Sequence, residues 1–106
     1  MFKWLDTKDV DALIARMVGE LTKRVPPEKF GSGSRRVEAK KDRTHDLVLR
    51  QAHDFARQHK LNVYTKARLA NGFKWALIDA GYPKDFVERM TIELAGVVAS
   101  AKSDPS

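Results

Sequence analysis

Apolar residues recur along the chain at intervals of three and four residues, which places them on one face of an α-helix. The first such segment predicts a helix at 7–24, with Asp6 as its N-cap and the pair Pro26-Pro27 as its stop. The apolar face of this helix consists of Val10, Leu13, Ile14, Met17, Val18 and Leu21.

The same spacing predicts three further helices. The second occupies 37–60, and the helical periodicity supports it from Thr44 onward. The third follows a Thr65 cap and ends at Gly81, and the fourth has Pro83 in its first turn. Their apolar faces are Val48, Leu49, Ala52, Phe55 and Ala56, then Leu69, Ala70, Phe73, Ala76, Leu77 and Ala80, and finally Phe86, Val87, Met90, Leu94, Val97, Val98 and Ala101.

These helices predict an all-α fold, a small four-helix domain that spans residues 1–106. The short link between the third and fourth helices predicts an antiparallel hairpin, whereas the long loop after the first helix leaves the position of that helix open. Residues 26–36 contain two prolines, two glycines and two serines, which predict a flexible basic loop. Residues 103–106 are predicted to form a disordered tail.

The positive charge of the chain lies in its middle. The whole sequence has 20 Lys/Arg and 14 Asp/Glu, a net charge of +6, and residues 23–74 alone carry 14 − 5 = +9. Such a concentration of positive charge attracts polyanions, so DNA or RNA is the first predicted partner. In this hypothesis the cations neutralise phosphates and an indole stacks on a base. The candidate residues are Arg35, Arg36, Lys40, Lys41, Lys66, Arg68, Asn71, Lys74 and Trp75.

An ordinary solvated surface is the alternative interpretation of this charge. Arg50 is four residues from both Asp46 and Asp54, so these side chains can form a ladder of weak i,i+4 pairs. The second and third helices also have the order of a helix-turn-helix, although their link contains no glycine.

The third helix places Trp75 on the side opposite its apolar face, near Arg68, Asn71 and Ile78. An exposed indole can stack on a base or anchor a protein partner. The alternative is that this helix lies in the centre of the domain, where other aromatic residues cover Trp75. The exposure of Trp75 therefore distinguishes the two interpretations.

A helical protein-interaction module, including a homodimer, is the second functional hypothesis. The fourth helix carries a flank of mostly small residues, Ile92, Ala95, Gly96 and Ala99, that would let another helix approach closely. The apolar anchor would be either Trp75 with Ile78 or Ile92 with Ala99. Alternatively, the first or second helix of the same chain covers this flank.

The sequence contains no recognisable catalytic or metal-binding pattern. It lacks cysteine, which is typical of a reducing compartment such as the cytoplasm. His45 and His59 are about 21 Å apart along a straight helix, and His53 points to another flank, so we expect no metal site. The sequence GSGS at 31–34 lacks the GKS or GKT ending of a phosphate-binding loop.

We therefore expect a non-enzymatic protein with no cofactor and no small-molecule substrate. No apolar run is long enough to span a bilayer, and residues 1–6 lack the apolar core of a signal peptide. The sequence accordingly predicts a cytoplasmic protein that does not engage the membrane.

Overall fold

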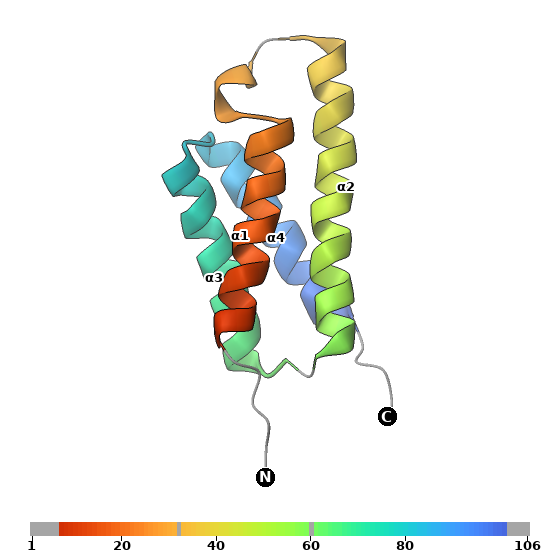
Figure 1. Cartoon of the computed structure of the whole chain (residues 1–106), viewed down its shortest axis with the longest axis vertical. Helices are drawn as coiled ribbons and strands as arrows, with labels where there is room; N and C mark the ends of the chain where they lie inside the picture. The colour runs from red at the N-terminus through yellow and green to blue at the C-terminus, as the bar shows by residue number, and fades with distance from the viewer. Residues whose placement is uncertain (1–6, 32, 60, 102–106) are drawn as a thin grey trace.

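The computed structural model describes residues 7–31, 33–59 and 61–101, and within these ranges the chain forms four α-helices and one 3₁₀ turn, without strands (Figure 1). The predicted all-α fold is confirmed. The predicted tail at 103–106 lies outside the described residues. The elements are α1 (Thr7–Arg24), η1 (Pro27–Lys29), α2 (Arg35–Gln58), α3 (Val63–Ala80) and α4 (Lys84–Ser100).

The helices form a bundle in which α2 and α3 occupy opposite corners. Helix α1 packs against α2 and α3, and α4 packs against the same two helices. Figure 1 shows α3 along one edge of the bundle and α2 along the other, with α1 and α4 between them. The chain reverses direction at each connection, so α3 and α4 form the predicted antiparallel hairpin. The outer faces of α2 and α3 consequently point away from each other.

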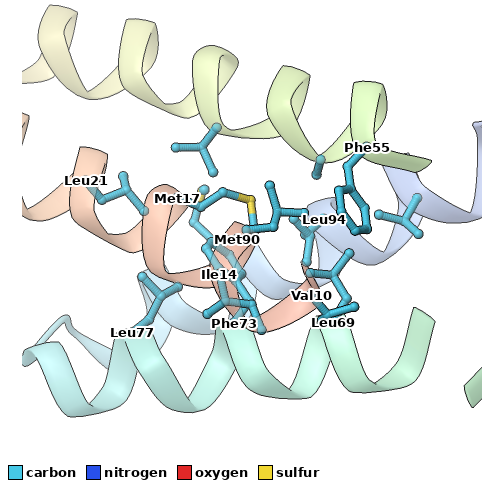
Figure 2. Packing of buried hydrophobic residues seen from close by; sticks show 14 of the residues in the cluster. Val10, Ile14, Met17, Leu21, Phe55, Leu69, Phe73, Leu77, Met90 and Leu94 are labelled. Carbon is cyan, nitrogen blue, oxygen red and sulfur yellow. The ribbon is translucent and has the colours of Figure 1, made fainter. Parts of the chain in front are cut away.

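The core is built from the apolar faces of all four helices, as the periodicity predicts (Figure 2). Met17 of α1, Phe73 of α3 and Met90 of α4 are completely buried where the helices meet. Helix α2 contributes less bulk, because its buried residues include the small side chains of Ala52 and Ala56. Six of the remaining predicted positions are partly buried and pack against this cluster, namely Val18, Leu49, Ala70, Ala76, Ala80 and Ala101, whereas Val97 is partly buried but does not belong to it.

Helices α1 and α3 approach each other closely at Gly72. A Cβ atom at this position would lie 2.5 Å from Cδ1 of Ile14, well inside van der Waals contact. The missing side chain therefore makes room for Ile14 between the two helices.

Helix α2 begins at Arg35, inside the segment that the sequence predicts as loop. Ser34 is its N-cap, and the Ser34 hydroxyl accepts a 3.4 Å hydrogen bond from the backbone N–H of Val37. Two helical residues, Arg35 and Arg36, thus belong to α2 rather than to the loop.

Helix α3 begins at Val63, and the predicted cap at Thr65 is wrong. Asn62 is the N-cap instead, because its side-chain oxygen accepts hydrogen bonds from the backbone N–H of Thr65 at 2.7 Å and from the Thr65 hydroxyl at 2.8 Å. At its other end, α3 stops as predicted before Gly81, whose positive φ of 97° suits glycine.

The connection between α1 and α2 is attached to the start of α4 by aromatic packing. The Phe30 ring lies 5.4 Å from the Tyr82 ring and 4.7 Å from the Phe86 ring, measured between centroids, with edge-to-face geometry. Lys41 of α2 places its Nζ 4.6 Å from the centre of the same Phe30 ring.

A buried hydrogen bond joins the same two regions. The Tyr82 hydroxyl donates to the carbonyl oxygen of Val25 at 2.8 Å. Burial, with a further contribution from the Glu28 carboxylate, raises the pKa of Tyr82 to about 12. The phenol therefore stays protonated and able to donate at neutral pH.

Replacing Tyr82 by Phe should lower the free energy of unfolding by about 1.5 kcal/mol, because the buried Val25 carbonyl loses its donor. Urea denaturation measures this change. The control is Tyr64→Phe, at a tyrosine that is 66% exposed, where we expect almost no effect. Equal stability of Tyr82→Phe and the wild type would show that this bond is unimportant.

Candidate binding surfaces

The structure divides the predicted nucleic-acid residues between two corners of the bundle. One group lies on the first two turns of α2 and the other on α3, and α1 and α4 separate these helices. The expected single basic surface is therefore not formed. The α2 group is Arg35, Arg36, Lys40 and Lys41, and the α3 group is Lys66, Arg68, Asn71, Lys74 and Trp75.

The cations of α3 do not form a continuous row. Lys66 is nine residues from Trp75, which at 3.6 residues per turn places it roughly on the opposite side of the helix. Arg68 places Nη2 3.5 Å from a carboxylate oxygen of Asp11 in α1. The Nζ of Lys74 lies 5.5 Å from the centre of the Trp75 ring. This side of the molecule therefore offers few cations for a polyanion.

Helix α3 instead presents apolar and aromatic side chains. Trp75 is 58% exposed and Ile78 is 41% exposed, so of the two interpretations the outward-facing one holds, and the alternative that other aromatic residues cover Trp75 is wrong for the described residues. A groove of about 430 Å³ runs beside them between α3 and α4, where Tyr82 and Val87 also line it. This surface suits a protein contact better than a phosphate backbone.

The outer face of α2 carries a row of arginines. Arg36, Arg43, Arg50 and Arg57 are all exposed and follow one another at intervals of seven residues, which is close to two helical turns. The row is roughly 31 Å long at 1.5 Å per residue. The last three arginines are missing from the predicted site, although their spacing is visible in the sequence. The sequence alone does not show that α2 extends back to Arg35. This extension places Arg36 on the same helix face as the other three arginines.

Fewer carboxylates than arginines share this face of α2. By their spacing they are Asp46 and Asp54, and each lies beside a histidine, with 3.3 Å from His45 Nδ1 to Asp46 and 3.8 Å from His53 Nδ1 to Asp54. Four arginines against two aspartates leave 4 − 2 = +2 on this face.

Three arginines of the row have no counter-ion in the part of the chain that the structure describes. Within the described ranges, Arg36, Arg43 and Arg50 form no ion pair, so the ladder that the sequence permits around Arg50 is absent. Their guanidinium groups are therefore available to an anionic partner.

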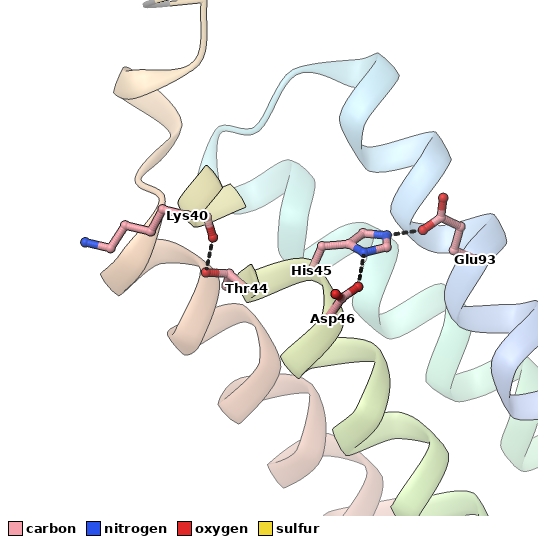
Figure 3. A network of polar contacts seen from close by, with 5 residues as sticks. All are labelled: Lys40, Thr44, His45, Asp46 and Glu93. Atoms are coloured by element: carbon pink, nitrogen blue, oxygen red, sulfur yellow. Dashed lines mark hydrogen bonds and ion pairs between the residues drawn. The ribbon is translucent and has the colours of Figure 1, made fainter. Parts of the chain in front are cut away.

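His45 links α2 to α4 through a hydrogen bond from its Nε2 to the Glu93 carboxylate, and its Nδ1 faces Asp46 (Figure 3). Burial of the imidazole opposes the charged form, but the hydrogen bonds and charges of Glu93 and Asp46 outweigh it and raise the pKa of His45 above its ordinary value. His45 and Glu93 line a pocket together with Lys41, Asp42 and Arg89.

Figure 3 also shows why a buried hydroxyl is tolerated nearby. Thr44 is almost completely buried, and its hydroxyl donates to the carbonyl oxygen of Lys40 at 2.7 Å. The described residues include no group of three or more metal-ligating side chains. The hydrogen bond between His45 and Glu93 makes this polar cluster a contact between α2 and α4.

The predicted small-residue flank of α4 faces solvent. Ile92 is 72% exposed, Ala95, Gly96 and Ala99 are exposed, and a Cβ atom added at Gly96 would touch nothing within 4 Å. The alternative that another helix of this chain covers the flank is therefore wrong for the described residues. Ile92 is the one large apolar side chain of this flank.

Comparison of the chain with protein-family models, curated proteins and solved structures finds no match. Among the described helices, none combines the length and the apolarity that crossing a lipid bilayer requires. The arginine row of α2 and the aromatic face of α3 are the two outward faces with the character of a binding surface.

The contact between His45 and Glu93 predicts a pH-dependent stability. Because folding raises the pKa of His45, the stabilisation is fully present below the ordinary value of 6.5 and is lost as the pH rises through the folded pKa. Glu93→Gln should lower the free energy of unfolding by about 0.5 kcal/mol near pH 5.5, allowing for solvent screening, and by less near pH 8.5.

Urea denaturation at both pH values measures the effect. Glu88→Gln, at an exposed position of the same helix, is the control and should cost the same at each pH. A Glu93→Gln variant whose cost is equal or greater at the higher pH would contradict the assignment.

Proposed function

We propose that this chain is a non-enzymatic binding domain that contacts nucleic-acid phosphates through the outer face of α2. The observation that carries the proposal is the row of four exposed arginines, Arg36, Arg43, Arg50 and Arg57, at seven-residue intervals. This proposed site contains the arginine row of α2 in place of the α3 residues that the sequence predicts. Arg36 belongs both to the predicted site and to the row.

Arginine suits this role because its guanidinium is planar, always charged and able to donate two parallel hydrogen bonds to one phosphate. Duplex DNA carries one charge per about 1.7 Å of its axis, so a row of roughly 31 Å spans a length of duplex with on the order of eighteen phosphates on its two strands together. Four arginines would contact a fraction of these. Contacts to phosphate alone carry no base information, so we expect little sequence preference.

Two cations at the start of α2 extend the positive surface. Arg35 and Lys40 are exposed and form no ion pair with the described residues. Lys41 is different, since its Nζ lies 3.6 Å from Glu38 and above the Phe30 ring. We therefore assign Lys41 to the packing of the loop and keep Arg35 and Lys40 as secondary phosphate contacts.

Binding of this kind needs no cofactor and no reacting group, in agreement with a sequence that contains no cysteine. The lack of cysteine also supports a reducing compartment, and we place the protein in the cytoplasm. Whether the natural ligand is DNA or RNA is an outcome of the binding experiment, because both present the same phosphates.

The triple variant Arg36→Gln/Arg43→Gln/Arg50→Gln should weaken binding to a labelled 20-bp duplex by roughly tenfold or more at moderate salt. Each lost phosphate contact reduces the slope of log K against log salt by about 0.9, so the slope should become shallower by about 2.7. Fluorescence anisotropy at several salt concentrations measures both quantities, and a single-stranded RNA of equal length compares the two ligands.

The control variant, Lys66→Gln/Lys74→Gln/Lys84→Gln, removes the same charge from α3 and the start of α4, at the corner of the bundle opposite the arginine row. It should retain most of the affinity. Equal weakening by both variants would show that the loss of affinity follows from net charge and not from the arginine row. Absence of binding by the wild type at low salt would refute the proposed function. Circular dichroism confirms that both variants remain helical.

A further inference from the structure

The outer face of α3 carries five side chains whose spacing is symmetric about Asn71. Ala67 and Trp75 each lie four residues from Asn71, and Tyr64 and Ile78 each lie seven residues from it. At about 100° per residue all five fall on one narrow stripe of the helix. Each of them is exposed, Tyr64 by 66% and Trp75 by 58%.

We propose that a second copy of this chain docks on this stripe, so that two α3 helices pack antiparallel around a two-fold axis at Asn71. In such a pair, residues equally far before and after Asn71 face each other across the axis. Tyr64 then meets Ile78 of the second copy, and Ala67 meets Trp75 of the second copy, each contact occurring twice.

The sizes of the facing side chains fit this register. Ala67 is small and exposed, and it leaves space on the helix surface for the large indole of the opposite Trp75. Tyr64 and Ile78 cover the two ends of the stripe with apolar surface. A large side chain opposite a small one, as at Trp75 and Ala67, lets two helices interlock.

The polar residue at the centre also suits self-pairing. A side-chain amide has both donors and an acceptor, so the two Asn71 side chains can hydrogen-bond to each other across the axis. A single asparagine within an apolar helix interface is an established way to fix register. Displacement of one helix by a turn would leave both amides without a partner.

The charge distribution favours a second copy at this face. The whole chain carries +6, so two copies repel each other in most orientations. Around the stripe, however, three basic residues are balanced by three acidic ones. The basic residues are Arg68, Lys74 and Lys84, and the acidic residues are Asp11, Asp79 and Glu88. The arginine rows of α2 then point away from the dimer interface on both sides.

The exposed area indicates a weak dimer. A covered aromatic side chain buries 150–250 Å², so the exposed parts of Tyr64 and Trp75 provide roughly 250 Å² on each copy. A standard stable interface buries about 800 Å² on each partner. We therefore expect weak self-association, so the experiment extends to high protein concentrations.

Disulfide cross-linking tests the register, because the natural sequence has no cysteine. In Asn71→Cys the two introduced thiols face each other at the axis and should form a covalent dimer on mild oxidation. The matched control is Ala67→Cys. Its thiols lie about 12 Å apart along the paired helices, too far for a disulfide, and should remain reduced.

Sedimentation velocity of the full chain between 1 and 200 μM tests the association without cysteine variants. We expect a monomer–dimer equilibrium that Trp75→Ala weakens by roughly tenfold or more, because each dimer loses two anchors. Ile92→Ala, on the exposed flank of α4, is the control and should leave the equilibrium unchanged. Higher salt should maintain or strengthen the dimer, because it screens the repulsion between two positive chains.

Three outcomes would overturn the proposal. A wild-type protein that stays monomeric throughout this range excludes the dimer. Equal cross-linking of Asn71→Cys and Ala67→Cys excludes the register, since it indicates random collision. If Ile92→Ala weakens the dimer more than Trp75→Ala does, the two copies associate through the α4 flank and not through α3.

Discussion

The simultaneous burial of α1 and α4 against both other helices is the constraint on which the arrangement of this molecule depends. Met17 of α1 and Met90 of α4 are completely buried at the centre, and full burial of such a side chain contributes about 1.5–3 kcal/mol. Because α1 and α4 fill the space between them, α2 and α3 stand at opposite corners. Any surface formed by α2 therefore faces away from any surface formed by α3.

This geometry gives two surfaces of different physical character. The outer face of α2 is charged, and a contact with phosphates there weakens steeply as salt is added. The outer face of α3 is aromatic and locally balanced in charge, so contacts there depend on apolar burial and respond little to salt. The proposed polyanion contact and the proposed self-association therefore use separate faces of the domain.

Much of the fold is predictable from the sequence because each helix has a regular apolar face. The first helix has the bounds that its periodicity and the following prolines indicate, and Gly81 ends α3 as expected. The start of α2 is not predictable in this way, since its first turns carry charged residues and few apolar ones. Asn62 and Thr65 are both suitable caps for α3, and only the observed hydrogen bonds distinguish them.

The candidate surfaces are less predictable, because they depend on which helices become neighbours. Periodicity correctly places Trp75 on the outside of α3, and the same reasoning separates it from Lys66. It does not reveal that α2 and α3 lie diagonally, which is what divides the basic residues. Nor does it reveal contacts such as the one between His45 and Glu93, which are 48 residues apart.

NMR tests most directly whether the polyanion contacts α2 and not α3. An isotope-labelled protein is titrated with an oligonucleotide, at a protein concentration that keeps the protein monomeric. The amide resonances around Arg36, Arg43 and Arg50 should shift, whereas the indole N–H of Trp75 should stay in place. A titration that moves the Trp75 indole and leaves the α2 resonances unchanged would contradict the assignment of the polyanion face to α2.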